Sequence, residues 1–178
     1  MIRLLKIGDV GNILELLKKY HETEDKNFEI VLNRNEKQLE ELILNGYIYG
    51  KYEQNELIGF ASMSKYNAID GLKKTKLENR IRKEKFFKDT GINNENTAVL
   101  LNDLIDANYR GNHLYKELVS IRLDKLKELG YEHVVAYLNI NKVIGINSFL
   151  KNGWEFGTLI EISENRYEFL LHYNNSCF

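Results

Sequence analysis

The residues best suited to chemistry lie between Asp106 and Tyr115, where an arginine and a glycine stand directly before a long helical pattern. Gly111 in such a turn lets several backbone N–H groups face outward together, and the helix N-terminus adds the positive end of its dipole. The Arg110 guanidinium can add charge-assisted hydrogen bonds. The stretch therefore predicts a phosphate or pyrophosphate site, although an Arg-Gly pair at a strand-helix turn is more often only a turn.

Two elements must position that turn. The apolar run from Ala98 to Ile105 is too short for a helix and is bounded by polar residues, which indicates a buried strand. Beyond Asn112, leucines and other apolar residues recur at three- and four-residue spacing up to the Gly130 stop, which predicts a helix. The next strand-like run, Val134 to Leu138, completes a parallel strand-helix-strand unit.

This unit resembles the acetyl-coenzyme A binding core of the GNAT superfamily of N-acetyltransferases, whose signature is Arg or Gln, two residues, Gly, one residue, Gly or Ala. Here the stretch reads Arg110-Gly-Asn-His-Leu-Tyr115, and the order of elements continues to match as far as Trp154. The resemblance implies that the turn holds the coenzyme pyrophosphate. The positions implied for this role are Arg110, Gly111, Asn112, His113, Leu114 and Tyr115.

The resemblance also implies a reaction and further site residues. A neutral amine attacks the thioester carbonyl at the C-terminal end of the central strand, where unpaired backbone N–H groups serve as the oxyanion hole. Backbone atoms of Leu104, Ile105 and Asp106 would bond the pantetheine arm and the acetyl carbonyl. Asn141 corresponds to the asparagine that precedes the family's fourth helix, with a one-residue slip.

Asp103 is the candidate for the base that takes a proton from the ammonium substrate. In a strand, side chains alternate, so one of Asn102 and Asp103 faces inward, and an inward carboxylate is costly without a purpose. The alternative, that Asp103 points to solvent at a strand end, is equally compatible with the sequence.

Three positions depart from the family pattern. His113 replaces the usual glycine, Tyr115 replaces glycine or alanine, and Phe149 stands where many members have the tyrosine that protonates the leaving thiolate. These departures favour an alternative function, a catalytically weak or inactive acyl-CoA-binding protein. A nucleic-acid-binding module is disfavoured, because the net charge is only −1 and no Gly-aromatic RNA motif is present.

Composition bounds the remaining possibilities. The 178 residues suit a single domain, 1–178, with an insertion at 64–96. Cys177 is the one cysteine, so an internal disulfide is excluded, and no run has the length of a transmembrane helix. We therefore expect a cytoplasmic protein with no membrane or nucleic-acid partner. The resemblance implies acetyl-CoA as cosubstrate, no metal, and a small-molecule or protein amine as acceptor. A homodimer stays open.

The whole chain predicts an α/β fold with a mixed central sheet of about six to seven strands and helices on both faces, as in GNAT proteins. The expected order is strand, helix, helix, strand, strand, the insertion, then strand, helix, strand, helix, strand, strand. The ranges expected outside the central unit are Met1–Ile7, a helix after the cap Asp9, a helix around Leu39–Ile43, a hairpin of 47–52 and 57–63, a helix at 141–152, and strands at 154–162 and 166–173.

The resemblance implies that the acceptor contacts two regions, Glu22 to Leu32 and Ser64 to Asn96, and neither carries a recognisable specificity motif. A helix is expected within the second region, which is locally basic. Its charges favour a solvated helix face over a lid or a contact for an acidic substrate. The basic residues are Lys73, Lys74, Lys76, Arg80, Arg82, Lys83 and Lys85.

Overall fold

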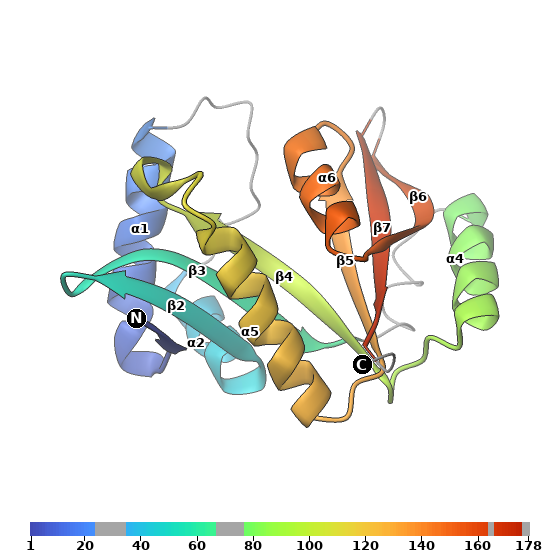
Figure 1. Cartoon of the computed structure of the whole chain (residues 1–178), viewed down its shortest axis with the longest axis horizontal. Helices are drawn as coiled ribbons and strands as arrows, with labels where there is room; N and C mark the ends of the chain where they lie inside the picture. The colour runs from blue at the N-terminus through green and yellow to red at the C-terminus, as the bar shows by residue number, and fades with distance from the viewer. Residues whose placement is uncertain (24–34, 67–76, 164–165, 176–178) are drawn as a thin grey trace. The chain divides into compact units, whose positions relative to one another are not determined.

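The computed structural model of the chain describes residues 1–23, 35–66, 77–163 and 166–175 (Figure 1). Most of the expected acceptor region Glu22 to Leu32, the lysines of 73–76 and Cys177 lie outside these ranges. The helices are α1 (Val10–Thr23), α2 (Glu36–Asn45), α4 (Leu77–Thr90), α5 (Leu114–Glu128) and α6 (Val143–Lys151), with short 3-10 helices η1 (Ile7–Asp9) and η2 (Ala107–Tyr109). The strands are β1 (Ile2–Leu4), β2 (Tyr47–Glu53), β3 (Glu56–Lys65), β4 (Thr97–Ile105), β5 (His133–Asn139), β6 (Glu155–Ser163) and β7 (Arg166–Asn174).

The predicted fold class and element order are confirmed. Seven strands form a mixed sheet in the order β1-β2-β3-β4-β5-β7-β6. Pairing is antiparallel in β1–β2, β2–β3, β5–β7 and β6–β7, whereas Thr97–Leu100 of β4 pairs in parallel with His133–Ala136 of β5. The chain divides into two compact units, one of Met1–Ser64 with Leu101–Asp124 and one of Lys65–Leu100 with Lys125–Phe178. The expectation of a single domain stays a prediction.

The first unit has helices on both faces of its strands (Figure 1). Leu104 of β4 packs into a core formed with α1 and α2. Its neighbour Asp103 bonds to Arg122 of α5. Because successive side chains of a strand point to opposite faces, these contacts place α5 on the face opposite α1 and α2. The buried members of the core are Leu5, Val10, Ile13, Leu16, Leu17, Tyr20, Leu39, Ile48, Leu57, Phe60 and Leu104.

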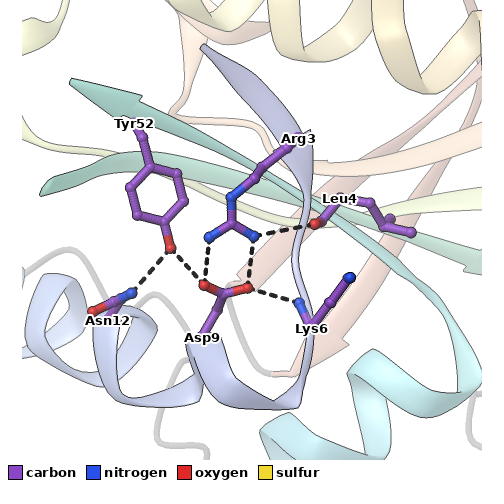
Figure 2. Close-up of polar contacts among 6 residues, drawn as sticks. All are labelled: Arg3, Leu4, Lys6, Asp9, Asn12 and Tyr52. Carbon is purple, nitrogen blue, oxygen red and sulfur yellow. Dashed lines mark hydrogen bonds and ion pairs between the residues drawn. The ribbon is translucent and has the colours of Figure 1, made fainter. Parts of the chain in front are cut away.

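A polar network ties β1, η1, α1 and β2 together (Figure 2). Arg3 donates two hydrogen bonds to the Asp9 carboxylate, at 2.8 and 2.6 Å, and the Lys6 N–H donates a third at 2.8 Å. The Tyr52 hydroxyl donates to Asp9 at 2.9 Å and accepts from the Asn12 amide at 3.0 Å. Asp9 thus lies in the 3-10 turn that leads into α1, with its carboxylate directed toward Arg3, Lys6 and Tyr52. These bonds hold the pKa of Asp9 far below its usual range.

The second unit is built on β7. All seven residues of β5, His133–Asn139, pair with Asn174 to Glu168 of β7, and β6 pairs with the other edge of β7. Helix α4 packs against β6, where a Cβ on Gly157 would come within 2.6 Å of the Phe86 ring. A glycine is therefore required at this close approach. Other buried apolar residues of the unit include Phe87, Val134, Val135, Ile146, Phe149, Trp154, Leu170 and Leu171.

Within the described ranges, every helix falls short of the length and apolar character needed to cross a membrane.

Candidate functional site

The turn between β4 and α5 begins at Asp106. Its carboxylate accepts a hydrogen bond from the Asn108 N–H at 2.9 Å, which caps η2, and its own N–H donates to the Ile58 carbonyl of β3 at 2.9 Å. That N–H is therefore already bonded within the protein. Leu104, Ile105 and Asp106 were expected to bind the pantetheine arm. The Asp106 N–H could donate to that arm only after its bond to Ile58 breaks.

The phosphate-binding candidates form an exposed turn. Gly111 has a φ of +83° and His113 a φ of +59°, so two residues of the turn adopt the left-handed conformation. Among the residues that the structure describes, the N–H groups of Gly111, Asn112 and His113 have no acceptor. A Cβ on Gly111 would meet no atom within 4 Å. Glycine is thus favoured there by its backbone conformation, and the turn leaves its donors open to an anion.

The start of α5 is anchored behind this turn. Leu114 is buried, and a Cβ placed on Gly59 of β3 would lie 3.4 Å from its Cδ2 atom. The Glu117 N–H donates to the His113 carbonyl at 3.1 Å, which closes the first turn of the helix. The His113 side chain is exposed. A histidine in this left-handed conformation therefore costs backbone strain, while its imidazole requires no space inside the protein.

Arg110 is oriented before any ligand arrives. Its side chain is exposed, and its Nε donates to the Ile105 carbonyl at 3.3 Å. The guanidinium is thus folded back toward the end of β4, beside the turn that it precedes. The sequence placed Arg110 next to the turn, and the structure adds the direction of its side chain.

Asp103 belongs to a buried ion pair. Its two carboxylate oxygens accept hydrogen bonds from Nη1 and Nη2 of Arg122, each at 2.7 Å. The Arg122 side chain has 0% exposure, and its other hydrogen bonds reach the Leu118 carbonyl and the Ser62 carbonyl, each at 3.0 Å. Burial raises the pKa of Asp103, while the guanidinium opposes this shift. Asp103 therefore faces inward, and the ion pair with Arg122 compensates for the cost of burying its carboxylate.

Tyr115 joins the same network. Its hydroxyl is hydrogen-bonded to Asp103, and burial together with that carboxylate raises its pKa well above the usual value. Tyr115 is therefore poorly suited to protonate a leaving thiolate at neutral pH. The hydrogen bond to Asp103 on β4 explains why a tyrosine is accommodated at position 115.

Asn141 and Phe149 belong to the second unit. The exposed Asn141 follows β5, and its N–H donates to the Asn139 side-chain oxygen at 2.9 Å. Phe149 is buried, with its ring edge-to-face on Trp154 at a centroid distance of 4.7 Å. A tyrosine at this position would extend from a packed aromatic pair.

One polar cluster in the second unit was not predicted from the sequence. The hydroxyls of Tyr66 and Tyr137 lie 2.6 Å apart, and the Lys83 ammonium lies 5.0 Å from the centroid of the Tyr137 ring. Lys83 is only 3% exposed, and burial lowers its pKa to about 8. The prediction of a solvated face is thus wrong for Lys83, although Arg82 and Lys85 are exposed as expected. The helical spacing of Lys83 with Phe86 and Phe87 was the available signal.

Two buried histidines form a second cluster in that unit. His133 Nδ1 and His172 Nε2 lie 3.0 Å apart, and the Phe86 ring is edge-to-face on His172. Burial lowers the pKa of His172 to about 4. Across the described ranges, no three His, Cys, Asp or Glu side chains gather to hold a metal ion.

Comparisons with known proteins identify the fold. Neither a family model nor a curated protein matches the sequence. Among solved structures, the chain is similar to a probable acetyltransferase from Staphylococcus epidermidis, with 19% identity over 98% of both chains and a TM-score of 0.71. An acetyltransferase of the GNAT family from Streptococcus pneumoniae gives 11% identity over 98% of both chains and a TM-score of 0.69.

A third similar structure was determined with a ligand. The PaiA N-acetyltransferase from Thermoplasma acidophilum, in complex with coenzyme A, gives 16% identity over 98% of both chains and a TM-score of 0.67. These likenesses extend over nearly the whole chain, and they confirm that its fold is the one shared by GNAT N-acetyltransferases.

Proposed function

We propose that this protein is an N-acetyltransferase that moves an acetyl group from acetyl-CoA to an amine. The observation that carries the proposal is the turn between β4 and α5, where left-handed residues follow Arg110 and leave backbone N–H groups open. This turn occurs on a fold shared with acetyltransferases, one of which was solved with coenzyme A.

The turn has the donors that a pyrophosphate requires. In the proposed complex, the N–H groups of Gly111, Asn112 and His113 bind phosphate oxygens, and the positive end of the α5 dipole adds to their field. Arg110 adds a guanidinium at the edge of the turn. Leu114 and Tyr115 fix the start of α5 against the strands, so that the donors are held in place before binding.

In the proposed reaction, the neutral amine nitrogen attacks the acetyl carbon and forms the amide bond, and the C–S bond breaks. The nitrogen gives up one proton as the amide forms, and coenzyme A leaves as a thiolate that takes up a proton. Backbone groups at Leu104 and Ile105 would hold the acyl arm, and Asn141 stays a proposed contact of the coenzyme.

Asp103 remains the proposed base for the incoming ammonium. Because both of its oxygens accept bonds from Arg122, a proton taken up by Asp103 would remove the negative charge that pairs with this buried guanidinium. A substitution of Asp103 must therefore be judged by stability as well as by rate.

The alternative proposal is an acyl-CoA-binding protein with little or no catalysis. It is favoured by Phe149, which is buried against Trp154 and has no proton to give, and by the raised pKa of Tyr115. A thiol with a pKa of about 8.5 is nevertheless a fair leaving group as the thiolate, so an enzyme does not require this acid.

We propose a small-molecule or protein amine as the acceptor, a cytoplasmic location, and no nucleic-acid or membrane partner. Homodimer formation is compatible with this function and is not required by it.

The test separates donor binding from catalysis. Calorimetry should show that coenzyme A and acetyl-CoA bind, and ligand at a hundred times its dissociation constant should add about 2.7 kcal/mol to the free energy of unfolding. Arg110→Ala should weaken binding, whereas Lys116→Ala, which removes an exposed cation from the same region, should change it little. Thiol release with a panel of amines then distinguishes the two proposals. An absence of binding at millimolar coenzyme would refute both.

A further inference from the structure

The long side chain of Arg110 is held on two sides although it is exposed. Its Nε donates to the Ile105 carbonyl at 3.3 Å, and its guanidinium carbon lies 6.0 Å from the centroid of the Tyr20 ring on α1. An unrestrained arginine loses rotamer entropy when it binds an anion. Contacts that already restrict the guanidinium reduce that loss.

Tyr20 is itself fixed by the core. It is 8% exposed and packs in the same cluster as Leu16 and Leu17 of α1. A ring held in this way presents a constant face, and a guanidinium near an aromatic face is attracted by the ring quadrupole. Tyr20 thus lies next to a residue of the candidate phosphate site.

We infer that Tyr20 is a positioning residue for coenzyme binding, which acts by holding the Arg110 guanidinium beside the turn at the start of α5. The inference rests on the proposed function, because the anion in question is the coenzyme pyrophosphate. It makes α1 a supporting element of the phosphate site. Tyr20 does not touch the ligand in this account, and its effect passes through Arg110 alone.

A cation–π contact at an exposed site contributes enough to change a dissociation constant by about two- to fivefold. Tyr20→Leu should therefore raise the dissociation constant of coenzyme A by that factor. Tyr20→Phe keeps the ring and removes the hydroxyl, so it should leave the dissociation constant close to that of the wild type. Because phenylalanine also fills the core, the dependence of the effect on Arg110 is what distinguishes a positioning role from a purely structural one.

The decisive experiment is a double-mutant cycle, read by calorimetry with coenzyme A as the probe. Tyr20→Leu and Tyr20→Phe are each prepared in the wild type and in the Arg110→Ala background. Once Arg110 is absent, Tyr20→Leu should cause no further loss of affinity. The neighbouring Lys19→Met serves as a matched control on α1. Lys19 is ion-paired with Glu56, so its removal should change the affinity less than Tyr20→Leu does.

Each outcome bears on the inference. An equal loss from Tyr20→Leu in both backgrounds would show that the effect does not pass through Arg110, and would overturn it. Unchanged affinity in a folded Tyr20→Leu protein would also overturn it. If Tyr20→Leu does not fold, Tyr20→Met takes its place in the cycle, because an unbranched side chain fills the site without a ring. A wild-type protein that binds no coenzyme refutes the proposed function itself, which is a separate result.

Discussion

Removing the charge of Asp103 should destabilise the first unit strongly. In the wild type, the carboxylate receives two bonds of 2.7 Å from a guanidinium with 0% exposure. Asp103→Asn has nearly the same shape, but it offers one acceptor where there were two and turns an NH2 donor toward an Nη donor. Arg122 is then left buried without its counter-charge. Breaking a buried pair from one side costs about 3–5 kcal/mol.

The double variant Asp103→Leu/Arg122→Met separates structure from catalysis. Replacing a buried ion pair with apolar residues of similar volume is often neutral, or stabilising by about 1–4 kcal/mol. Urea denaturation should therefore show a large loss for Asp103→Asn and a recovery of stability in the double variant. If the double variant also recovers thiol release, Asp103 is not the base. If it is stable and lacks the rise of the rate with pH that deprotonation of a base produces, the base assignment is supported.

The stability of Asp103→Asn tests whether Arg122 depends on this carboxylate. A loss of less than about 1 kcal/mol for Asp103→Asn would mean that Arg122 finds another counter-charge or that water reaches the pair. The Ser62 and Leu118 carbonyls would then be sufficient partners for the guanidinium.

Three further predictions concern stability. Gly111→Ala should lower the free energy of unfolding by about 1 kcal/mol in urea denaturation, because φ is +83° while no atom obstructs a Cβ; an unchanged value would place the turn outside the left-handed region. His172 has a folded pKa of about 4 against an ordinary 6.5, so the unfolded chain binds more protons between these values and stability should fall as pH drops through that window. Melting curves should show a smaller fall for His172→Leu, and equal falls would contradict the assignment. Lys83 has a folded pKa of about 8 against 10.5, so stability should rise with pH between these values, and this rise should vanish in Lys83→Met.

Much of the fold could be read from the sequence because its signals are local. The apolar run around Val99 predicted β4, and the helical spacing after Asn112 predicted α5, each to within about two residues at its ends. The hairpin at 47–63 and the later strands were found in the same way. The left-handed turn at Gly111 also follows from residue type, since glycine adopts that conformation at little cost.

The order of the last strands was decided by tertiary structure. Strand β7 lies between β5 and β6. The alternation of apolar residues in β6 and β7 is compatible with either strand next to β5, because a hairpin can present either edge. The choice depends on contacts such as Phe86 on Gly157, which join segments far apart in the chain.

The polar partners of the site were likewise beyond sequence reasoning. Asp103 and Arg122 are separated by 19 positions, and Tyr20 lies on a different helix from the turn that Arg110 precedes. Residue type and spacing determined which groups could bind an anion or carry a proton. Only the packing of α1 and α5 on opposite faces of the strands determined which of these groups meet, because a charge is tolerated inside a protein only where the fold brings its partner to it.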